Sequence, residues 1–252
     1  MKVIAVTNIK GGVGKTTTAV NLAYLCAACG RDTLLWDLDP QGAATYVLGV
    51  ETSEQDGASV KKLLTGKSEI PELILSTEYL NLDLLPADFS YRKFDVHLSA
   101  HKNPTERLMK MSRSLRSSYA ALFLDCPPGI SLLSENVLRA ADAVIVPMLP
   151  SPLSLRMLVQ LRTFIDDQGW GDVLLLPFFS MVDARRSLHR ELIESTRKQF
   201  PAILKTVIPY WSEIERMTLR RAPLPAFAPS SAGSLAYAAL WAEITERMKK
   251  RA

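Results

Sequence analysis

The chain has 252 residues, of which 48% are hydrophobic and 22% are charged. These fractions are typical of a globular domain and exclude a largely disordered, collagenous or coiled-coil chain. One α/β domain of this length can bury a full core without disulfides or a structural metal. We therefore expect a single domain over residues 1–252.

The formal net charge of +4 is distributed unevenly along the chain. Residues 181–252 carry a charge of +6, whereas the first 180 residues carry −2. A basic C-terminal region suggests a polyanionic partner, although a basic face is usually just a solvated face.

Features of export and membrane insertion are missing from the sequence. No apolar run reaches the roughly 18 residues that span a bilayer, and the N-terminus does not resemble a signal peptide. Three cysteines imply no disulfide framework, and we expect Cys26 and Cys29 to be reduced core residues rather than a redox or metal pair. The sequence therefore predicts a cytoplasmic protein.

Short apolar runs alternate with helical patterns along the chain. The runs are continuous rather than alternating, which is typical of strands buried on both faces of a parallel sheet. We expect a doubly wound, mostly parallel α/β sheet flanked by helices, with ligands beyond the carboxyl ends of the strands. Residues 49–76 are interpreted as a short helix with loops. The expected strands are residues 3–7, 33–36, 82–85, 121–124, 143–146, 173–176 and 206–208, and the expected helices are 15–29, 104–117, 131–140, 154–168, 188–200 and 234–250.

A glycine-rich loop, K-G-G-V-G-K-T-T, follows the first strand and opens the first helix. Its glycines allow backbone N–H groups to point at an anion, and the helix adds the positive end of its dipole. The loop departs from the general P-loop pattern because Ile9 replaces the opening glycine. The predicted phosphate-binding residues are Lys10, Gly11, Gly12, Val13, Gly14, Lys15, Thr16 and Thr17, with the Thr16 hydroxyl also on Mg²⁺.

This loop resembles the signature of the ParA/MinD ATPases, a deviant Walker A, SIMIBI-like class of P-loop NTPases. The resemblance implies that ATP and Mg²⁺ are the cofactors and that Lys15 contacts the β- and γ-phosphates. It also gives a role to Lys10, which would reach across a homodimer to the partner's phosphates. Two protomers would then enclose two ATP molecules between them.

Two further segments are similar to ParA motifs. The run D-L-D-P-Q-G at residues 37–42 matches the D-x-D-P-Q-G stretch. By resemblance, Asp39 orients the attacking water, and Asp37 supports the Mg²⁺ hydration shell or the loop. The run D-C-P-P-G at residues 125–129 matches the D-x-P-P Walker B region, so Asp125 would hold Mg²⁺. Met181 and Pro209 match positions that flank the base, and Tyr210 or Trp211 could stack on the adenine or belong to the core.

The resemblance implies a slow ATPase that serves as a switch. The ATP dimer would bind double-stranded DNA without sequence preference, and a ParB-like or cargo-linked partner would stimulate hydrolysis. Such a protein would be nucleoid-associated and would partition DNA or position a protein cargo. The alternatives are a MinD-like membrane-surface ATPase and, less favoured, a metabolic synthetase of the same fold. We expect residues 235–252 to pack on the sheet, which disfavours the membrane. The predicted DNA contacts are Arg185, Arg186, Arg190, Lys198, Arg216, Arg220, Arg221 and Lys249.

Overall fold

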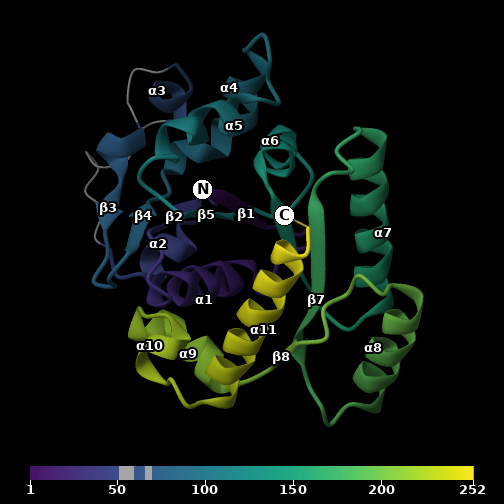
Figure 1. The fold of residues 1–252 in the computed structure, drawn as a ribbon. Coiled ribbons are helices and arrows are strands. Elements are labelled where there is room, and N and C mark those ends of the chain that lie inside the picture. The colour runs from purple at the N-terminus through teal and green to yellow at the C-terminus, as the bar shows by residue number, and fades with distance from the viewer. Residues whose placement is uncertain (51–59, 66–69, 252) are drawn as a thin grey trace.

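A computed structural model describes residues 1–50, 60–65 and 70–251 (Figure 1). Its strands lie side by side in the order β3-β4-β2-β5-β1-β6-β7-β8, and every neighbouring pair is parallel except β3 with β4. The strands are β1 (Lys2–Val6), β2 (Thr33–Asp37), β3 (Leu75–Ser76), β4 (Leu82–Leu85), β5 (Ala121–Asp125), β6 (Ala143–Met148), β7 (Leu174–Val182) and β8 (Val207–Pro209). The predicted doubly wound, mostly parallel α/β fold is confirmed.

Helices cover both faces of this sheet (Figure 1). The helices are α1 (Lys15–Ala28), α2 (Ala43–Val47), α3 (Val60–Thr65), α4 (Phe94–Ser99), α5 (Arg107–Met111), α6 (Leu132–Ala140), α7 (Pro152–Asp167), α8 (Ser187–Gln199), α9 (Ser212–Arg220), α10 (Leu224–Phe227) and α11 (Ala232–Lys249). Helices α3 to α8 share one hydrophobic cluster with the sheet, and α1, α2, α9, α10 and α11 share the other. Because both faces are covered, β2, β5 and β6 are buried at every position.

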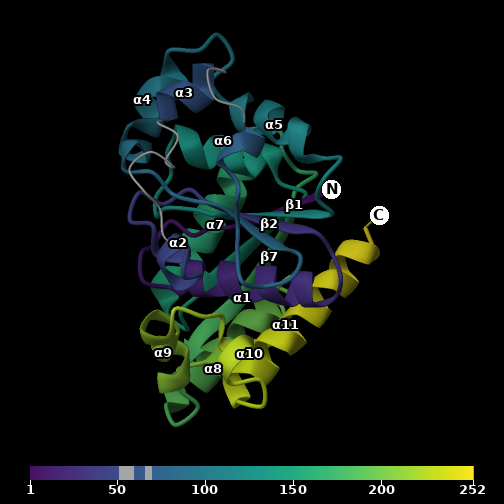
Figure 2. The ribbon, with the colours of Figure 1, turned by 90° about the vertical axis from the view of Figure 1, so that its left-hand side faces the viewer.

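The edge of the sheet where the parallel strands end is the one that matters for ligands. Helices α2 and α9 lie at this carboxyl edge, whereas both chain termini lie at the opposite, amino edge (Figure 2). Helix α11 runs from one edge to the other, so its basic last turn lies beside Lys2 at the start of β1.

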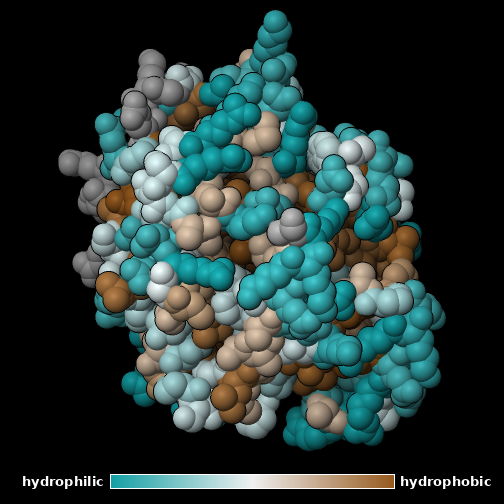
Figure 3. Space-filling model, viewed as in Figure 1, coloured by the Kyte–Doolittle hydropathy of each residue, from teal (hydrophilic) through white to brown (hydrophobic). Residues whose placement is uncertain are grey.

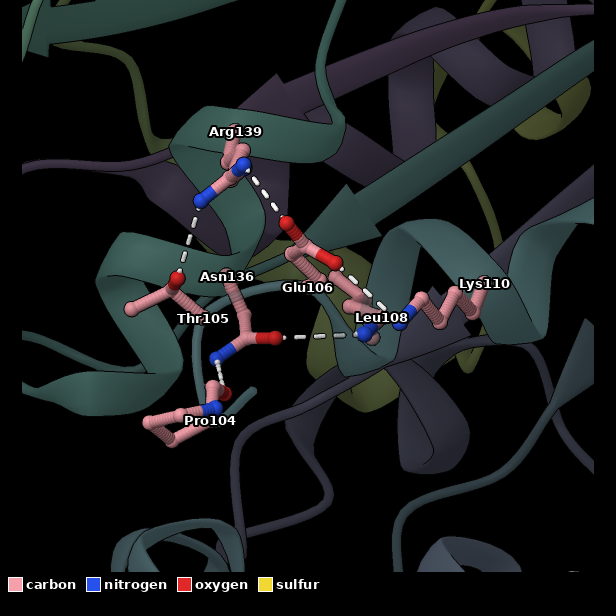
Figure 4. A network of polar contacts seen from close by, with 7 residues as sticks. All are labelled: Pro104, Thr105, Glu106, Leu108, Lys110, Asn136 and Arg139. Carbon is pink, nitrogen blue, oxygen red and sulfur yellow. Dashed lines mark hydrogen bonds and ion pairs between the residues drawn. The ribbon is translucent and has the colours of Figure 1, made fainter. Parts of the chain in front are cut away.

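Most of the long elements begin and end close to the predicted residues, but one predicted helix is broken. The pattern at 104–117 forms α5 and then a single 3₁₀ turn, Ser112–Leu115. Buried Asn136 of α6 holds the segment before α5 in a non-helical path (Figure 4). Its Nδ2 donates to the Pro104 carbonyl at 2.7 Å, and its Oδ1 accepts from the Leu108 N–H at 3.2 Å. A tertiary contact therefore overrides local helical propensity.

Several short elements were missed by the sequence patterns, namely β3, α2, α4, α9 and α10. Within residues 49–76 the structure has α3 and a 3₁₀ turn at Ile70–Leu73, while residues 51–59 and 66–69 lie outside the described part. Strand β7 extends six residues beyond its predicted end at 176. It continues through Pro177 because its ladder with β8 begins only at Phe179, past the residue that lacks an N–H.

Two packing predictions need correction. Cys26 is buried, but Cys29 is exposed because it is the C-cap residue of α1. In α11, Leu240, Trp241 and Ile244 pack on the sheet as predicted. Leu235, at 60% exposure, and Ala238 do not. The exposed side of α11 is hydrophobic near its start, where Leu235 and Ala238 lie, and hydrophilic toward its C-terminal end (Figure 3). Among the described residues, no helix combines the length and apolarity needed to span a membrane.

Candidate nucleotide site

The glycine-rich loop leaves the carboxyl end of β1 and enters α1 through two residues in the left-handed region. Gly12 has φ of 68° and Gly14 has φ of 86°. A Cβ at Gly14 would also lie 3.1 Å from the Ser180 hydroxyl oxygen. Gly14 is the N-cap of α1 and provides no side-chain cap, so the first-turn N–H groups are available to an anion. The loop therefore has the geometry of a phosphate cradle.

Asn8 holds this loop in place, a role that the sequence analysis missed. Its Oδ1 accepts from the Lys10 N–H at 2.9 Å, and its Nδ2 donates to the Pro147 carbonyl at 2.7 Å. Asn8 is buried, and its position between the first strand and the glycines was the only available signal.

The two lysines of the loop differ in environment. Lys15 is 7% exposed and its Nζ donates to the Lys10 carbonyl at 3.2 Å. Burial lowers the pKa of Lys15, and the charge of Asp125 opposes this shift. The Lys10 side chain is half-buried and has no hydrogen bond or ion pair with any described residue. Lys15 is thus fixed within its own loop, whereas Lys10 is free to reach another group.

Asp125 ends β5 directly beside Asp37, which ends β2. Asp125 is fully buried, and within the described chain neither carboxylate oxygen has a hydrogen bond of normal geometry. Burial raises the pKa of Asp125, as does the charge of Asp37, while the Thr16 hydroxyl and the Lys15 ammonium lower it. An unpartnered buried carboxylate next to a threonine hydroxyl fits the coordination sphere of Mg²⁺.

Asp37 has the contacts of a loop support. Its Oδ2 accepts from the Thr45 N–H and from the Thr45 hydroxyl, both at 2.8 Å. Its Oδ1 accepts from the Asp39 N–H at 3.2 Å. Burial raises the pKa of Asp37, and the bonds from Thr45 lower it. Of the two roles expected for Asp37, these contacts support the second, because both oxygens are already used within the loop. Thr45 was not predicted.

Asp39 lies half-buried at the carboxyl edge, and its Oδ1 accepts from the Gln41 N–H at 3.0 Å. Its charge raises the pKa of Lys15, so the two side chains lie within electrostatic range. The structure therefore brings Lys15, Thr16, Asp39 and Asp125 to one end of the sheet.

The residues expected around adenine also come together. Met181 and Pro209 line a small cavity of about 50 Å³, together with Gly14 and Thr17 from the start of α1. Tyr210 and Trp211 line the same cavity and are 57% and 46% exposed. The alternative that these two aromatic residues belong to the core is wrong, and both stay available to a ligand.

The eight predicted DNA-binding residues do not form one patch. Lys249 lies at the amino edge, and Lys198 lies in the last turn of α8, where it pairs with Glu194 at 3.2 Å. The others follow β7 or lie on or next to α9. Three of them are engaged within the chain: Arg185 with Asp183, Arg190 with the Ala184 carbonyl and Arg221 with the Tyr46 carbonyl.

A parallel α/β sheet with a phosphate cradle after its first strand, and a buried carboxylate at the end of a neighbouring strand, defines the class of P-loop nucleotide-binding proteins. The AAA domain family matches residues 1–168. Sporulation initiation inhibitor protein Soj of Bacillus subtilis is 34% identical over 96% of this chain and 98% of its own length. Chromosome partitioning protein ParA of Myxococcus xanthus is 34% identical over 98% and 88%.

The chain belongs to this AAA domain family and, within it, to the ParA/MinD-type ATPases. The structure of cobyrinic acid a,c-diamide synthase from Mycobacterium smegmatis with ADP and magnesium is also similar. It covers 99% of this chain and 96% of its own, with a TM-score of 0.81 and 28% identity. The protein is thus an ATPase that uses ATP and Mg²⁺.

Proposed function

We propose that this ATPase is a switch that binds DNA as an ATP dimer. ATP joins two protomers at their carboxyl edges, and the dimer binds double-stranded DNA without sequence preference. Hydrolysis, accelerated by a ParB-like or cargo-linked partner, separates the protomers. The cycle partitions plasmid or chromosomal DNA or positions a protein cargo on the nucleoid. The name of the Myxococcus xanthus relative, chromosome partitioning protein ParA, supports partitioning.

Two exposed arginines on α9, at the carboxyl edge, support the DNA proposal. Arg216 and Arg220 are exposed and have no hydrogen bond or ion pair within the described residues. Helix α9 packs against α2. Helix α2 follows the Asp39 loop, which comprises residues 38–42 between β2 and α2. Unpaired arginines beside the nucleotide site can contact phosphates and double in number on dimerisation. Arg186, exposed at the start of α8, is the third proposed contact.

In the proposed reaction the chain acts by positioning and electrostatics. Lys15 and the loop amides hold the phosphates, and Asp39 orients the attacking water. Thr16 and Asp125 would hold Mg²⁺, which supplies positive charge against the phosphate oxygens when bound. Lys10, which has no ion pair with any described residue, offsets the charge of the partner's nucleotide across the dimer.

The membrane alternative loses support from α11. A membrane-bound helix needs a free apolar face, but Leu240, Trp241 and Ile244 are buried in the core of this domain. The similarity to the diamide synthase keeps an ATP-dependent synthetase as the second candidate.

The proposal is tested by binding to non-specific duplex DNA with ATP, with ADP and without nucleotide, at two salt concentrations. We expect binding with ATP alone, weakened steeply by salt because phosphate contacts release counterions. The double variant Arg216→Ala/Arg220→Ala should lose binding and keep ATP affinity. Lys198→Ala, which removes a single positive charge from α8, is the control and should keep binding. Equal binding in all three nucleotide states, or none in any, would refute the DNA switch.

A further inference from the structure

Arg221 occupies a backbone position that normally suits glycine. It is the C-cap of α9 and has φ of 49° and ψ of 49°, in the left-handed region. Glycine adopts this conformation at helix C-termini without a steric penalty, and other residues do so at a cost. The backbone conformation of Arg221 therefore costs free energy that contacts of its side chain can offset.

That side chain contacts α2. The Arg221 Nε donates to the Tyr46 carbonyl at 3.2 Å, and the guanidinium carbon lies 5.0 Å from the centre of the Tyr46 ring. A hydrogen bond and a cation–π contact thus reach the same residue. The backbones are also close, because a Cβ on Gly49 would lie 3.6 Å from the Arg221 carbonyl oxygen.

The N-terminal end of α2 is held by Asp37 at the nucleotide site. The helix has only five residues, too few to be stable alone. Asp37 caps its first turn through the Thr45 N–H and hydroxyl. The segment between Asp37 and α2 contains Asp39, which hydrogen-bonds to the Gln41 N–H. This loop is therefore fixed at one end by Asp37 and at the other by the Arg221 contact with Tyr46.

We propose that Arg221 is a positioning residue for ATP hydrolysis. It anchors the C-terminal part of α2 to α9, which keeps the Asp39 loop in the geometry required for turnover. This inference rests on the proposed role of Asp39. Arg221 then links α9 to the site, and Arg216 and Arg220 of α9 remain the proposed phosphate contacts.

The test compares substitutions of Arg221 with matched controls, using steady-state ATPase activity without DNA, nucleotide affinity and thermal melting. Arg221→Gly removes the side chain but suits the left-handed backbone, so Tm should change by less than about 3 °C. We expect kcat to fall about fivefold with KM for ATP within twofold of wild type. Arg116→Ala removes an exposed arginine on the opposite face of the sheet, outside the site and the proposed DNA contacts, and should leave kcat unchanged.

A double-mutant cycle with Tyr46 separates this role from general destabilisation. Tyr46→Phe keeps the ring and the carbonyl and should behave as wild type, whereas Tyr46→Ala should lower kcat. Adding Arg221→Gly to Tyr46→Ala should lower it little further, because both variants break one link. Unchanged kcat in Arg221→Gly, or equal loss in Arg116→Ala, would overturn the inference. Asp39→Ala is measured alongside, since normal turnover in that variant refutes the role of Asp39 separately.

Discussion

Asp125 destabilises the folded protein when Mg²⁺ is absent, although the same carboxylate is suited to bind Mg²⁺. A buried carboxylate without hydrogen-bond partners in the described chain is costly, and the neighbouring Asp37 adds repulsion. We predict that Asp125→Asn raises the free energy of unfolding without Mg²⁺ by about 1 kcal/mol or more. The same variant should lose the stabilisation that Mg²⁺ with ATP gives the wild type. Urea denaturation with a chelator, and then with Mg²⁺ and ATP, measures both effects.

The pH dependence of this effect has a defined sign. The folded protein holds the pKa of Asp125 above its ordinary value of 3.8, because burial and Asp37 disfavour the charged form. The folded state then binds the proton more tightly than the unfolded state, so this stabilisation is present at low pH and is lost as pH rises through the folded pKa. The Mg²⁺-free stability gap between Asp125→Asn and wild type should therefore widen from pH 4 to pH 8. A stability difference that stays constant with pH would contradict the raised pKa of Asp125 in the folded protein.

Asp39 is expected to act in turnover rather than in binding. Its carboxylate lies near Lys15 but accepts only the Gln41 N–H among the described groups, which leaves acceptor capacity for a water molecule. We predict that Asp39→Ala binds ATP with affinity within about threefold of wild type and hydrolyses it at least about 100-fold more slowly. Nucleotide binding and single-turnover hydrolysis, measured on one preparation, distinguish the two effects. Normal hydrolysis would remove Asp39 from the mechanism.

Lys15, Asp39 and Asp125 were predicted from motifs at the ends of strands, the two aspartates by resemblance to ParA motifs. These motifs did not identify Asn8, Thr45 or Tyr46. Their roles depend on contacts with a carbonyl in β6, a carboxylate eight residues away and a helix end 175 residues away. No local pattern contains such information, so these positioning residues required the structure.

At the level of elements, α11 also secures the start of β8. The Glu243 carboxylate accepts from the Lys205 N–H at 2.7 Å, and from the Thr206 N–H at 2.9 Å and its hydroxyl at 2.8 Å. These groups directly precede β8, the outermost strand on this side of the described sheet, and would otherwise lack partners. Burial alone would raise the pKa of Glu243, but these hydrogen bonds outweigh it and lower the pKa below 4.5.

We therefore predict that Glu243→Ala lowers the free energy of unfolding by about 1–2 kcal/mol at pH 7. Because the folded pKa is lowered, this contribution is present above the unfolded value of 4.5 and disappears as pH falls through the folded pKa. The difference from wild type should shrink at pH 3. Glu246→Ala, which removes an exposed ion pair with Lys250, is the control and should change stability by less than about 0.5 kcal/mol. Equal effects of the two variants would show that Glu243 has no special role.

Element length explains which parts of the fold were predictable. Continuous buried strands and the long helices α1, α7, α8 and α11 carry strong patterns in their own residues. Helices α2, α4 and α10 have four to six residues and form because neighbouring elements hold them. Helix α9 buries only Met217 fully, so its sequence indicated a charged segment rather than a packed helix.

For the whole molecule, the proposed dimer, in which two copies meet at the carboxyl edge, explains why the glycine-rich loop has two lysines. Lys10 has no ion pair within the described residues of its own chain, and its loop already contains Lys15 as a phosphate-binding cation. A second lysine beside one nucleotide is redundant in a monomer, but across an interface it offsets the charge of the partner's phosphates. Arg216 and Arg220 would then act from both protomers on one DNA segment.

This leads to a prediction made in the Asp39→Ala background, where slow turnover keeps ATP in place. Adding Lys10→Ala should leave ATP binding to the monomer within about fivefold and abolish both the ATP dimer and DNA binding. Adding Lys15→Ala instead should abolish ATP binding itself, because its ammonium is fixed inside the phosphate loop. Light scattering reports the mass, and a fluorescent ATP analogue reports binding. If the Lys10→Ala protein still dimerises with ATP, the interface does not use this lysine. DNA binding by Arg216 and Arg220 must then depend on another contact between the protomers.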